Sequence, residues 1–159
     1  MKRFLALPLV FLLAVGAVSA SSAFDALLND FSSDAVFDVQ YFDEDTNVSI
    51  GEHNFTIPKG YGEIDQLDVN LKVKNDSQLV KLFTNGNGDV LVVSITADEI
   101  LNDASAYIPD DIPYENATVN GQEGLKWNQE GNSYFVYLEN NDAIVLQSQK
   151  DFNFEDMIV

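Results

Sequence analysis

The segment 117-ATVNGQEGLKWNQEGNSYFVYLENNDAIVLQSQ-149 decides the fold of this chain. Three parts of it are rich in aromatic and aliphatic residues: Val119–Trp127, Tyr134–Glu139 and Ala143–Gln149. Turn-forming residues separate these parts: Glu130-Gly131-Asn132 and Asn140-Asn141-Asp142. Short apolar runs that alternate with Gly- and Asn-rich turns are typical of antiparallel strands joined by hairpins. The segment therefore predicts a meander of three antiparallel strands.

Four runs upstream of this meander also have strand character: Val48–Ile57, Leu67–Lys74, Leu79–Thr84 and Val90–Ile95. The run Leu67–Lys74 alternates strictly between apolar and polar residues, as a strand with one face in water does. The last two runs flank Asn85–Asp89, whose Asn-Gly steps tolerate the positive φ that tight hairpins need. Pro58 and Gly60 are expected to end the first strand.

One helix is predicted to begin at Thr96, because Thr96-Ala97-Asp98-Glu99 matches the capping-box pattern. Apolar residues follow at helical spacing, and Pro109 ends the pattern. A last short helical turn over Phe154–Ile158 is a further candidate. The expected fold class is therefore α+β, with six or seven mostly antiparallel strands and one or two helices packed on one face.

The N-terminus has the features of an export signal. Met1-Lys2-Arg3 precedes the apolar run Phe4–Val18, and Val18-Ser19-Ala20 supplies the small residues of a cleavage site. The expected organisation is a signal peptide over residues 1–20, a flexible acidic lead-in over 21–46 and a single α+β domain over 47–159. An uncleaved membrane anchor is the alternative, although the run is shorter than the ~20 residues of a typical membrane-spanning helix.

The composition excludes several classes of function. The chain has 26 acidic residues against 8 Lys and Arg, and its formal net charge is −18. Nucleic acids and anionic membrane surfaces require a basic face, so neither is an expected partner. The chain has no cysteine, which excludes thiol nucleophiles, zinc–thiolate sites and iron–sulfur clusters. No cofactor is expected.

Four N-glycosylation sequons are consistent with an exported protein, and none has proline at its middle position. The candidate acceptors are Asn47, Asn54, Asn75 and Asn116.

Several motifs together resemble the small, uncharacterised exported surface domains of methanogenic archaea. These motifs are the strand end Phe55–Tyr61, the turn region Val119–Gly124, the aromatic strand Tyr134–Tyr137 and the closing Phe154–Met157. The chain is more distantly similar to the PsbP-like fold. The resemblance covers residues 48–159 and implies an antiparallel sheet with flanking helices in a non-catalytic assembly or binding protein. It transfers no functional residue.

Two groups of residues are candidates for chemical sites. His53 is the only histidine, and a surface position is expected for it because no nucleophile or orienting group accompanies it in the sequence. Asp43, Asp45 and Asn47 resemble the first half of a calcium loop. Val48 and Asn54 replace the glycine and the bidentate glutamate of such a loop, so the sequence favours an acidic linker that leads into a strand. No catalytic residue or metal site is assigned.

Trp127, Tyr134 and Tyr137 are candidate binding residues, because an outward-facing tyrosine would offer a stacking surface to a sugar or peptide. Cross-strand core pairing is the ordinary role of such residues. The sequence thus favours an exported, extracellular or cell-surface, non-enzymatic binding or structural module that contacts a protein or glycan. It would contact a membrane only if the signal segment is uncleaved. The alternative is a small hydrolase of extracellular polymers that uses paired carboxylates.

Overall fold

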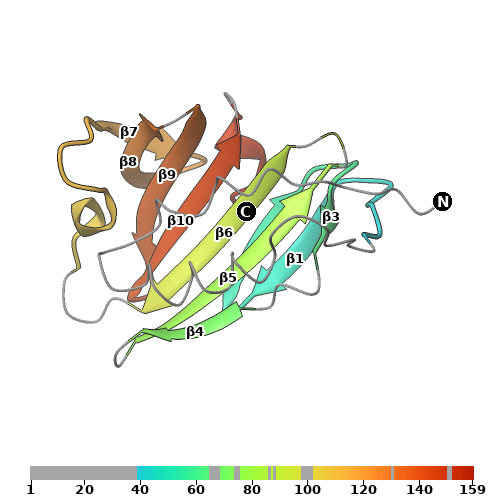
Figure 1. Ribbon diagram of the computed structural model, residues 1–159, viewed down its shortest axis with the longest axis horizontal. Coiled ribbons are helices and arrows are strands. Elements are labelled where there is room, and N and C mark those ends of the chain that lie inside the picture. Colours follow the sequence, from blue (N-terminus) through green and yellow to red (C-terminus); the bar gives the residue numbers. More distant parts are fainter. Residues whose placement is uncertain are drawn as a thin grey trace, which may run out of the picture.

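The computed structural model describes residues 39–64, 69–73, 76–85, 87, 89–97, 102–129, 131–149 and 152–159. The expected signal peptide and the acceptor Asn75 lie outside these residues. The described part is built from a large, twisted antiparallel sheet and a separate two-stranded sheet (Figure 1). The prediction of a mostly antiparallel sheet is therefore confirmed, although the described residues form ten strands rather than the six or seven expected.

The large sheet has eight strands within the described residues. Its spatial order is β3 (Gly62–Glu63), β5 (Asp76–Thr84), β6 (Val90–Ala97), β10 (Asp142–Gln149), β9 (Asn132–Glu139), β8 (Gln122–Gln129) and β7 (Glu115–Val119), with β4 (Val69–Val73) also paired to β5. The last strand, β10, lies between β6 and β9 and so joins the two halves of the sheet. This places β7 at one edge.

The small sheet is a hairpin of β1 (Thr46–Ile50) and β2 (His53–Ile57). The sequence predicted one continuous strand over Val48–Ile57, and this prediction is wrong. Gly51 has a φ of +61° and reverses the chain between Ile50 and His53, which pair with each other. Glycine adopts a positive φ without the steric cost that other residues carry.

The predicted meander contains one turn more than expected. The run Val119–Trp127 is interrupted at Asn120 and Gly121, whose φ values are +43° and +85°. These are the values of a tight hairpin turn, and they separate β7 from β8. The predicted hairpin between β5 and β6 is confirmed, as is the one between β9 and β10.

The predicted helices are not confirmed. Thr96 and Ala97 continue strand β6, so the capping-box assignment is wrong at its first two positions, and residues 98–101 lie outside the described part. The rest of the expected helix contains a single 3₁₀ turn, η2 (Ala104–Tyr107), which Asp103 caps by accepting a hydrogen bond from the Ser105 amide. A second 3₁₀ turn, η3 (Phe154–Asp156), lies near the C-terminus.

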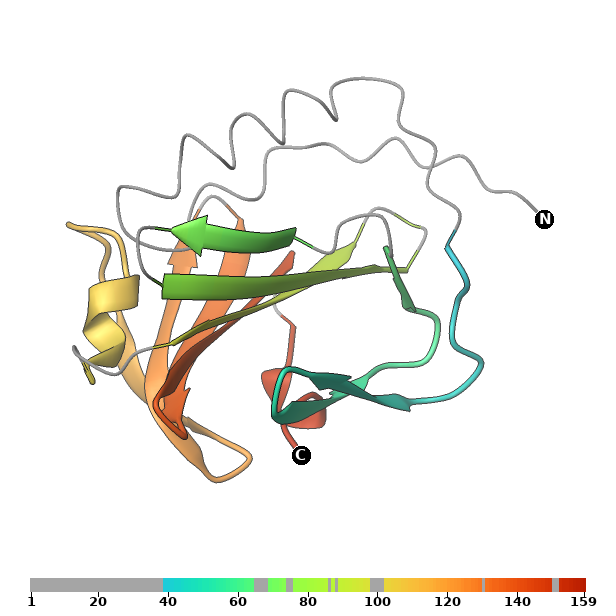
Figure 2. The same cartoon turned by 90° about the horizontal axis from the view of Figure 1, so that it is seen from below.

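One face of the large sheet carries the main hydrophobic core. The β1–β2 hairpin and the C-terminal segment (residues 152–159) pack on this face, and Figure 2 shows them together on one side of the sheet. The fully buried members include Phe55, Ile57, Phe135, Leu146 and Met157. Strand β2 contributes through alternate residues, because His53, Phe55 and Ile57 are buried while Asn54 is exposed.

A smaller core lies on the opposite face of β8, β9 and β10. Trp127, Tyr134, Val136 and Val145 form it, and Ile108 from the η2 segment covers them. A hollow remains between this covering segment and strand β7.

The residues that precede β1 make backbone contacts with the β2–β3 connection. Phe42 donates to the Tyr61 carbonyl and accepts from the Gly60 amide, at 2.8 and 2.9 Å. A Cβ on Gly62 would lie 2.4 Å from the Gln40 oxygen, so only glycine permits this close approach.

Candidate functional site

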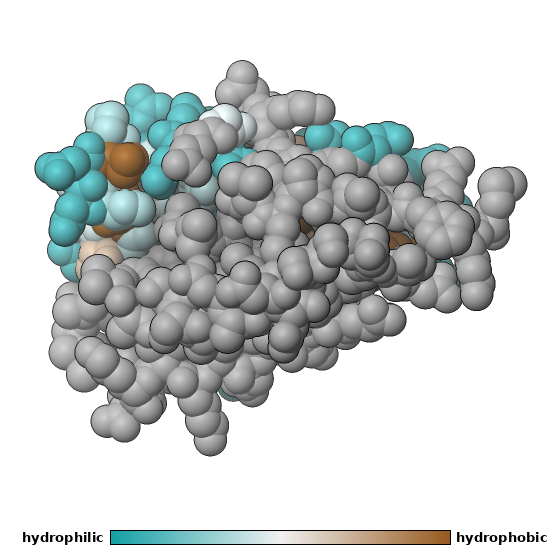
Figure 3. Space-filling model, in the orientation of Figure 1, coloured by the Kyte–Doolittle hydropathy of each residue, from teal (hydrophilic) through white to brown (hydrophobic). Residues whose placement is uncertain are grey.

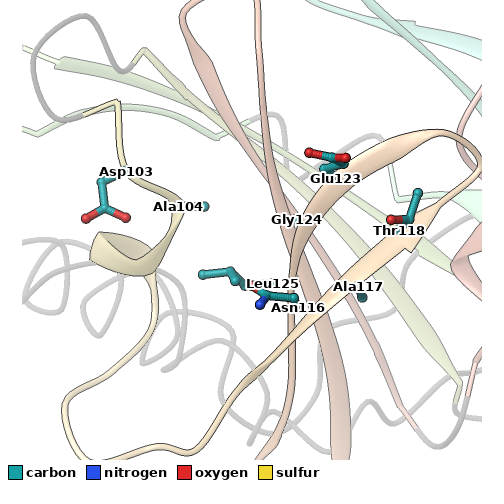
Figure 4. Close-up of a pocket in the computed structure, with 8 residues that line it drawn as sticks. All are labelled: Asp103, Ala104, Asn116, Ala117, Thr118, Glu123, Gly124 and Leu125. Atoms are coloured by element: carbon teal, nitrogen blue, oxygen red, sulfur yellow. The ribbon is translucent and has the colours of Figure 1, made fainter.

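A surface hollow lies between the η2 segment and strands β7 and β8, of which β7 is the edge strand. It has a volume of about 520 Å³ and is lined by eight residues: Asp103, Ala104, Asn116, Ala117, Thr118, Glu123, Gly124 and Leu125. In Figure 4, Asp103 and Ala104 stand on the η2 side, across from the two strands. The hollow therefore lies between the η2 turn on one side and the β7–β8 hairpin on the other.

The register of β7 and β8 explains which side chains line the hollow. Thr118 pairs with Glu123, and Asn116 pairs with Leu125. Directly paired residues of an antiparallel sheet project from the same face, so these four side chains share one side. Figure 4 shows Thr118 and Glu123 together at one end of the hollow. The amide of Asn116, the hydroxyl of Thr118 and the carboxylate of Glu123 thus lie around a small apolar floor, which Leu125 and Ala104 form.

The surface around this hollow is mostly polar. Figure 3 shows a predominantly hydrophilic described surface in the region of η2 and β7, with small hydrophobic spots within it. The side chains of Asp103, Asn116, Thr118 and Glu123 are all exposed. Hydrogen bonds from the Ser105 hydroxyl and amide lower the pKa of Asp103, so this carboxylate is ionised at neutral pH.

A second cluster of polar side chains lies at the opposite surface of the sheet, centred on His53. Nδ1 of His53 lies 2.8 Å from Oε2 of Glu139, and Nε2 lies 2.8 Å from Oδ2 of Asp142. The other carboxylate oxygen of Glu139 accepts a hydrogen bond of 3.0 Å from Gln122. The cluster therefore links β2 to three strands of the large sheet.

The expectation that His53 lies on the surface is wrong, because only 3% of the residue is exposed. His53 follows the Gly51 turn and belongs to the buried set of alternate residues in β2. The two nitrogens point from opposite sides of the ring to different carboxylates, so both carboxylates cannot join His53 around one ion. Within the described ranges, no three His, Asp or Glu side chains are arranged to hold a metal.

The aromatic binding candidates lie inside the protein. Trp127, Tyr134 and Tyr137 are each 2% exposed. The rings of Trp127 and Tyr134 stack across β8 and β9, with centroids 4.8 Å apart and planes 6° apart. Tyr137 lies on the other face and stacks on Phe135. All three residues therefore pack the two cores and present no face to a ligand.

The calcium candidates hold the start of the domain together through hydrogen bonds. Oδ1 of Asp45 accepts from the Lys59 amide at 2.8 Å, and Oδ1 of Asn47 accepts from the Thr56 hydroxyl at the same distance. Asp43 is exposed just before them. These contacts give Asp45 and Asn47 a structural role at the edge of the hairpin.

The two sequons of the hairpin are bonded to each other. Thr56, the hydroxyl residue of the Asn54 sequon, donates to Asn47, while Ser49 of the Asn47 sequon donates to Asn54 at 2.7 Å. This exchange follows from the register, in which Asn47 faces Thr56 and Ser49 faces Asn54. Both acceptor residues are exposed on the outer face of the hairpin.

The sequon at Asn116 lies in a different environment. Asn116 and Thr118 are both exposed on β7 and both line the hollow. An attached glycan would therefore emerge beside this hollow.

Sequence reasoning did not identify the partners of His53, and of the residues that line the hollow it identified only Asn116, as a glycosylation acceptor. The partners of His53 lie 86 and 89 residues away along the chain, and no local motif connects them. The signal that was available is the Asn140-Asn141 turn, because it predicts that Glu139 and Asp142 face each other.

Comparisons with models of protein families, with curated proteins and with solved structures give no match for this chain. In the described part of the chain, no helix has the length and apolar character needed to cross a membrane.

Proposed function

We propose that the protein is an exported, extracellular or cell-surface module that binds a protein or glycan and catalyses no reaction. The observation that supports this proposal is the hollow beside the edge strand β7, where a small apolar floor is surrounded by exposed hydrogen-bonding groups. Binding sites commonly combine apolar surface with a few polar groups that orient the ligand.

Two features of this surface suit a partner of that kind. The floor residues Ala104 and Leu125 offer apolar area, while Asn116, Thr118 and Glu123 offer donors and acceptors for sugar hydroxyls or peptide groups. Strand β7 also ends the sheet in the described structure, so its outer backbone groups face away from β8. An extended peptide segment can pair with such an edge.

The alternative is a small hydrolase that uses paired carboxylates, and the geometry gives it less support. A general acid in such an enzyme requires a raised carboxyl pKa, whereas the pKa of Asp103 in the hollow is lowered. The directly opposed pair Glu139 and Asp142 binds His53. Those carboxylates are engaged in holding the fold.

The proposal is tested by crosslinking the full-length protein on intact cells of its own host, followed by purification and identification of the crosslinked partner. We compare the parent with Glu123→Arg, which changes the rim of the hollow. Glu155→Arg is the matched control, since Glu155 is equally charged, exposed and located on η3, away from the hollow.

One dominant cell-surface partner is expected for the parent and for Glu155→Arg, and its yield should fall at least tenfold in Glu123→Arg. Recovery of the parent without a partner would contradict a binding module. Equal capture by both variants would move the binding surface away from the hollow.

A further inference from the structure

The environment of His53 determines its protonation state. Ionised carboxylates only accept hydrogen bonds, and each ring nitrogen of His53 faces a carboxylate oxygen at 2.8 Å. Both nitrogens must then carry a hydrogen, which is true only of the imidazolium ion. We propose that His53 is a buried cation in the folded protein at neutral pH and acts as a proton-dependent latch between the β1–β2 hairpin and the β9–β10 turn.

The groups that face His53 from each neighbouring strand favour this charge. Glu139 comes from β9 and Asp142 from β10, while β8 contributes the neutral Gln122. Within the hairpin, the residue paired with His53 is the apolar Ile50, and the exposed Glu52 precedes it in the chain. The described surroundings of the ring are therefore anionic or neutral.

The two carboxylates also need a cation between them. Glu139 and Asp142 face each other directly in the register of β9 and β10. Like charges at directly opposed positions destabilise a sheet. A protonated His53 removes this repulsion, because it is shared between both groups.

The pKa of His53 has the direction that this geometry requires. Burial of the ring lowers the pKa, but the hydrogen bonds to Asp142 and Glu139 and the charges of both carboxylates raise it by more. The net pKa lies above the ordinary value of 6.5. A group whose pKa is raised in the folded state stabilises that state fully below the unfolded pKa, and this contribution is lost as pH rises through the folded pKa.

The latch acts at one end of the hairpin. The other end is held by the C-terminal segment, through the hydrogen bond from the Thr56 amide to the Met157 carbonyl and the bridge between Phe55 and Ile158. A neutral His53 has one N–H, so one carboxylate would then lose its donor and face a lone pair. The turn end, with the buried Ile50, is therefore the part that loosens when the proton is lost.

The first test is an NMR titration of the imidazole nitrogens in the full-length protein, in which the single histidine makes the assignment unambiguous. Both imidazole nitrogens of His53 should be protonated at pH 7, and the midpoint of the titration should lie above the ordinary histidine pKa of 6.5. A neutral ring at pH 7, or a midpoint at or below the ordinary value, would overturn the proposal.

The second test uses substitutions that keep the size of the carboxylates. Asp142→Asn and Glu139→Gln should each lower the midpoint by about 1 unit or more, since each removes one opposite charge. Asp156→Asn is the control, because Asp156 is exposed on η3 and is not among the hydrogen-bond partners of His53 or Glu139 in the described structure. The titration midpoint of His53 should not change in Asp156→Asn. Equal shifts of this midpoint in all three variants would contradict a local latch.

The third test asks whether the proton holds the hairpin. Amide hydrogen exchange around Ile50 and His53 should accelerate above the midpoint relative to the amides of the central strands β6 and β10. Asp142→Asn should show this acceleration at lower pH. Exchange that stays parallel in the hairpin and the central strands across the titration would show that the proton does not control the hairpin.

Discussion

The side chain of Asn120 donates a hydrogen bond of 2.6 Å to the carbonyl oxygen of Ile158. Asn120 is in the tight turn between β7 and β8, whereas Ile158 is next to the end of the chain and bridges to Phe55 in β2. The C-terminal segment therefore lies between the hairpin and the edge of the large sheet and is bonded to both. Its buried residues Phe154 and Met157 fill the core between them.

Substitutions of Asn120 separate the contribution of this hydrogen bond from that of the turn. Asn120→Gly keeps a residue that accepts the positive φ and removes the bond, so it should cost about 1 kcal/mol. Asn120→Ala adds the strain of a left-handed conformation, about 1 kcal/mol more. Asn140→Gly is the control, because Asn140 has a similar φ of +52° and is exposed. Urea midpoints at an unchanged m-value measure all three, and equal losses in Asn120→Gly and Asn140→Gly would show that the bond contributes nothing.

Gly124 is required by close packing rather than by its backbone conformation. A Cβ at this position would lie 2.2 Å from the Val136 carbonyl oxygen and 2.8 Å from the Phe135 ring. Gly124→Ala should therefore cost about 3 kcal/mol, because backbone and a buried ring would both have to move. Gly131→Ala is the comparison, because a Cβ at Gly131 would meet no atom within 4 Å but the residue has a φ of +81°. This substitution should lower the free energy of unfolding by about 1 kcal/mol. Thermal unfolding of both variants decides this, and a smaller loss at Gly124 would contradict the packing argument.

Most strands of the large sheet could be predicted because their buried positions are occupied by runs of apolar residues, which turn-forming residues separate. Strands β9 and β10 are nearly continuous in apolar residues and are separated by an Asn-Asn turn. The turn at Asn120 was not predicted although it is an Asn-Gly step, since the edge strand β7 and its neighbour β8 have few buried residues and their alternation is weak. The hairpin turn at Gly51 was not predicted for a different reason, because two strands of five residues each, joined by a two-residue turn, read as one longer strand.

The helix prediction failed at Thr96 because pairing across the sheet outweighs a local capping preference. Thr96 pairs with both Gln78 and Ala143, so its backbone is engaged on two sides of strand β6. Local patterns predict only part of the His53 cluster, because the Asn140-Asn141 turn sets Glu139 opposite Asp142 but does not bring His53 to them. Its members come from β2, β8, β9 and β10, and only the topology brings them together.

Trp127 carries a buried indole N–H without a hydrogen-bond partner in the described structure. Trp127→Phe removes this group and keeps an aromatic ring against Tyr134, so it should cost less than the 3–5 kcal/mol typical of removing the whole side chain as alanine. Circular dichroism in urea measures both variants, because the only tryptophan is lost in each. A loss for Trp127→Phe as large as that for Trp127→Ala would contradict this prediction.

Tyr137 makes the protein sensitive to alkaline pH. Burial of its hydroxyl and then the nearby charge of Glu139 raise the pKa of Tyr137 well above the ordinary value of 10. Because the unfolded chain ionises first, stability is fully present below about pH 10 and is lost as pH rises above it. Tyr137→Phe should therefore flatten the decline in urea midpoint between pH 9 and 11 relative to the parent. Tyr114→Phe is the matched control, since Tyr114 is 52% exposed. This substitution should leave the decline in urea midpoint unchanged. An equally steep decline in Tyr137→Phe would place the alkaline sensitivity at another residue.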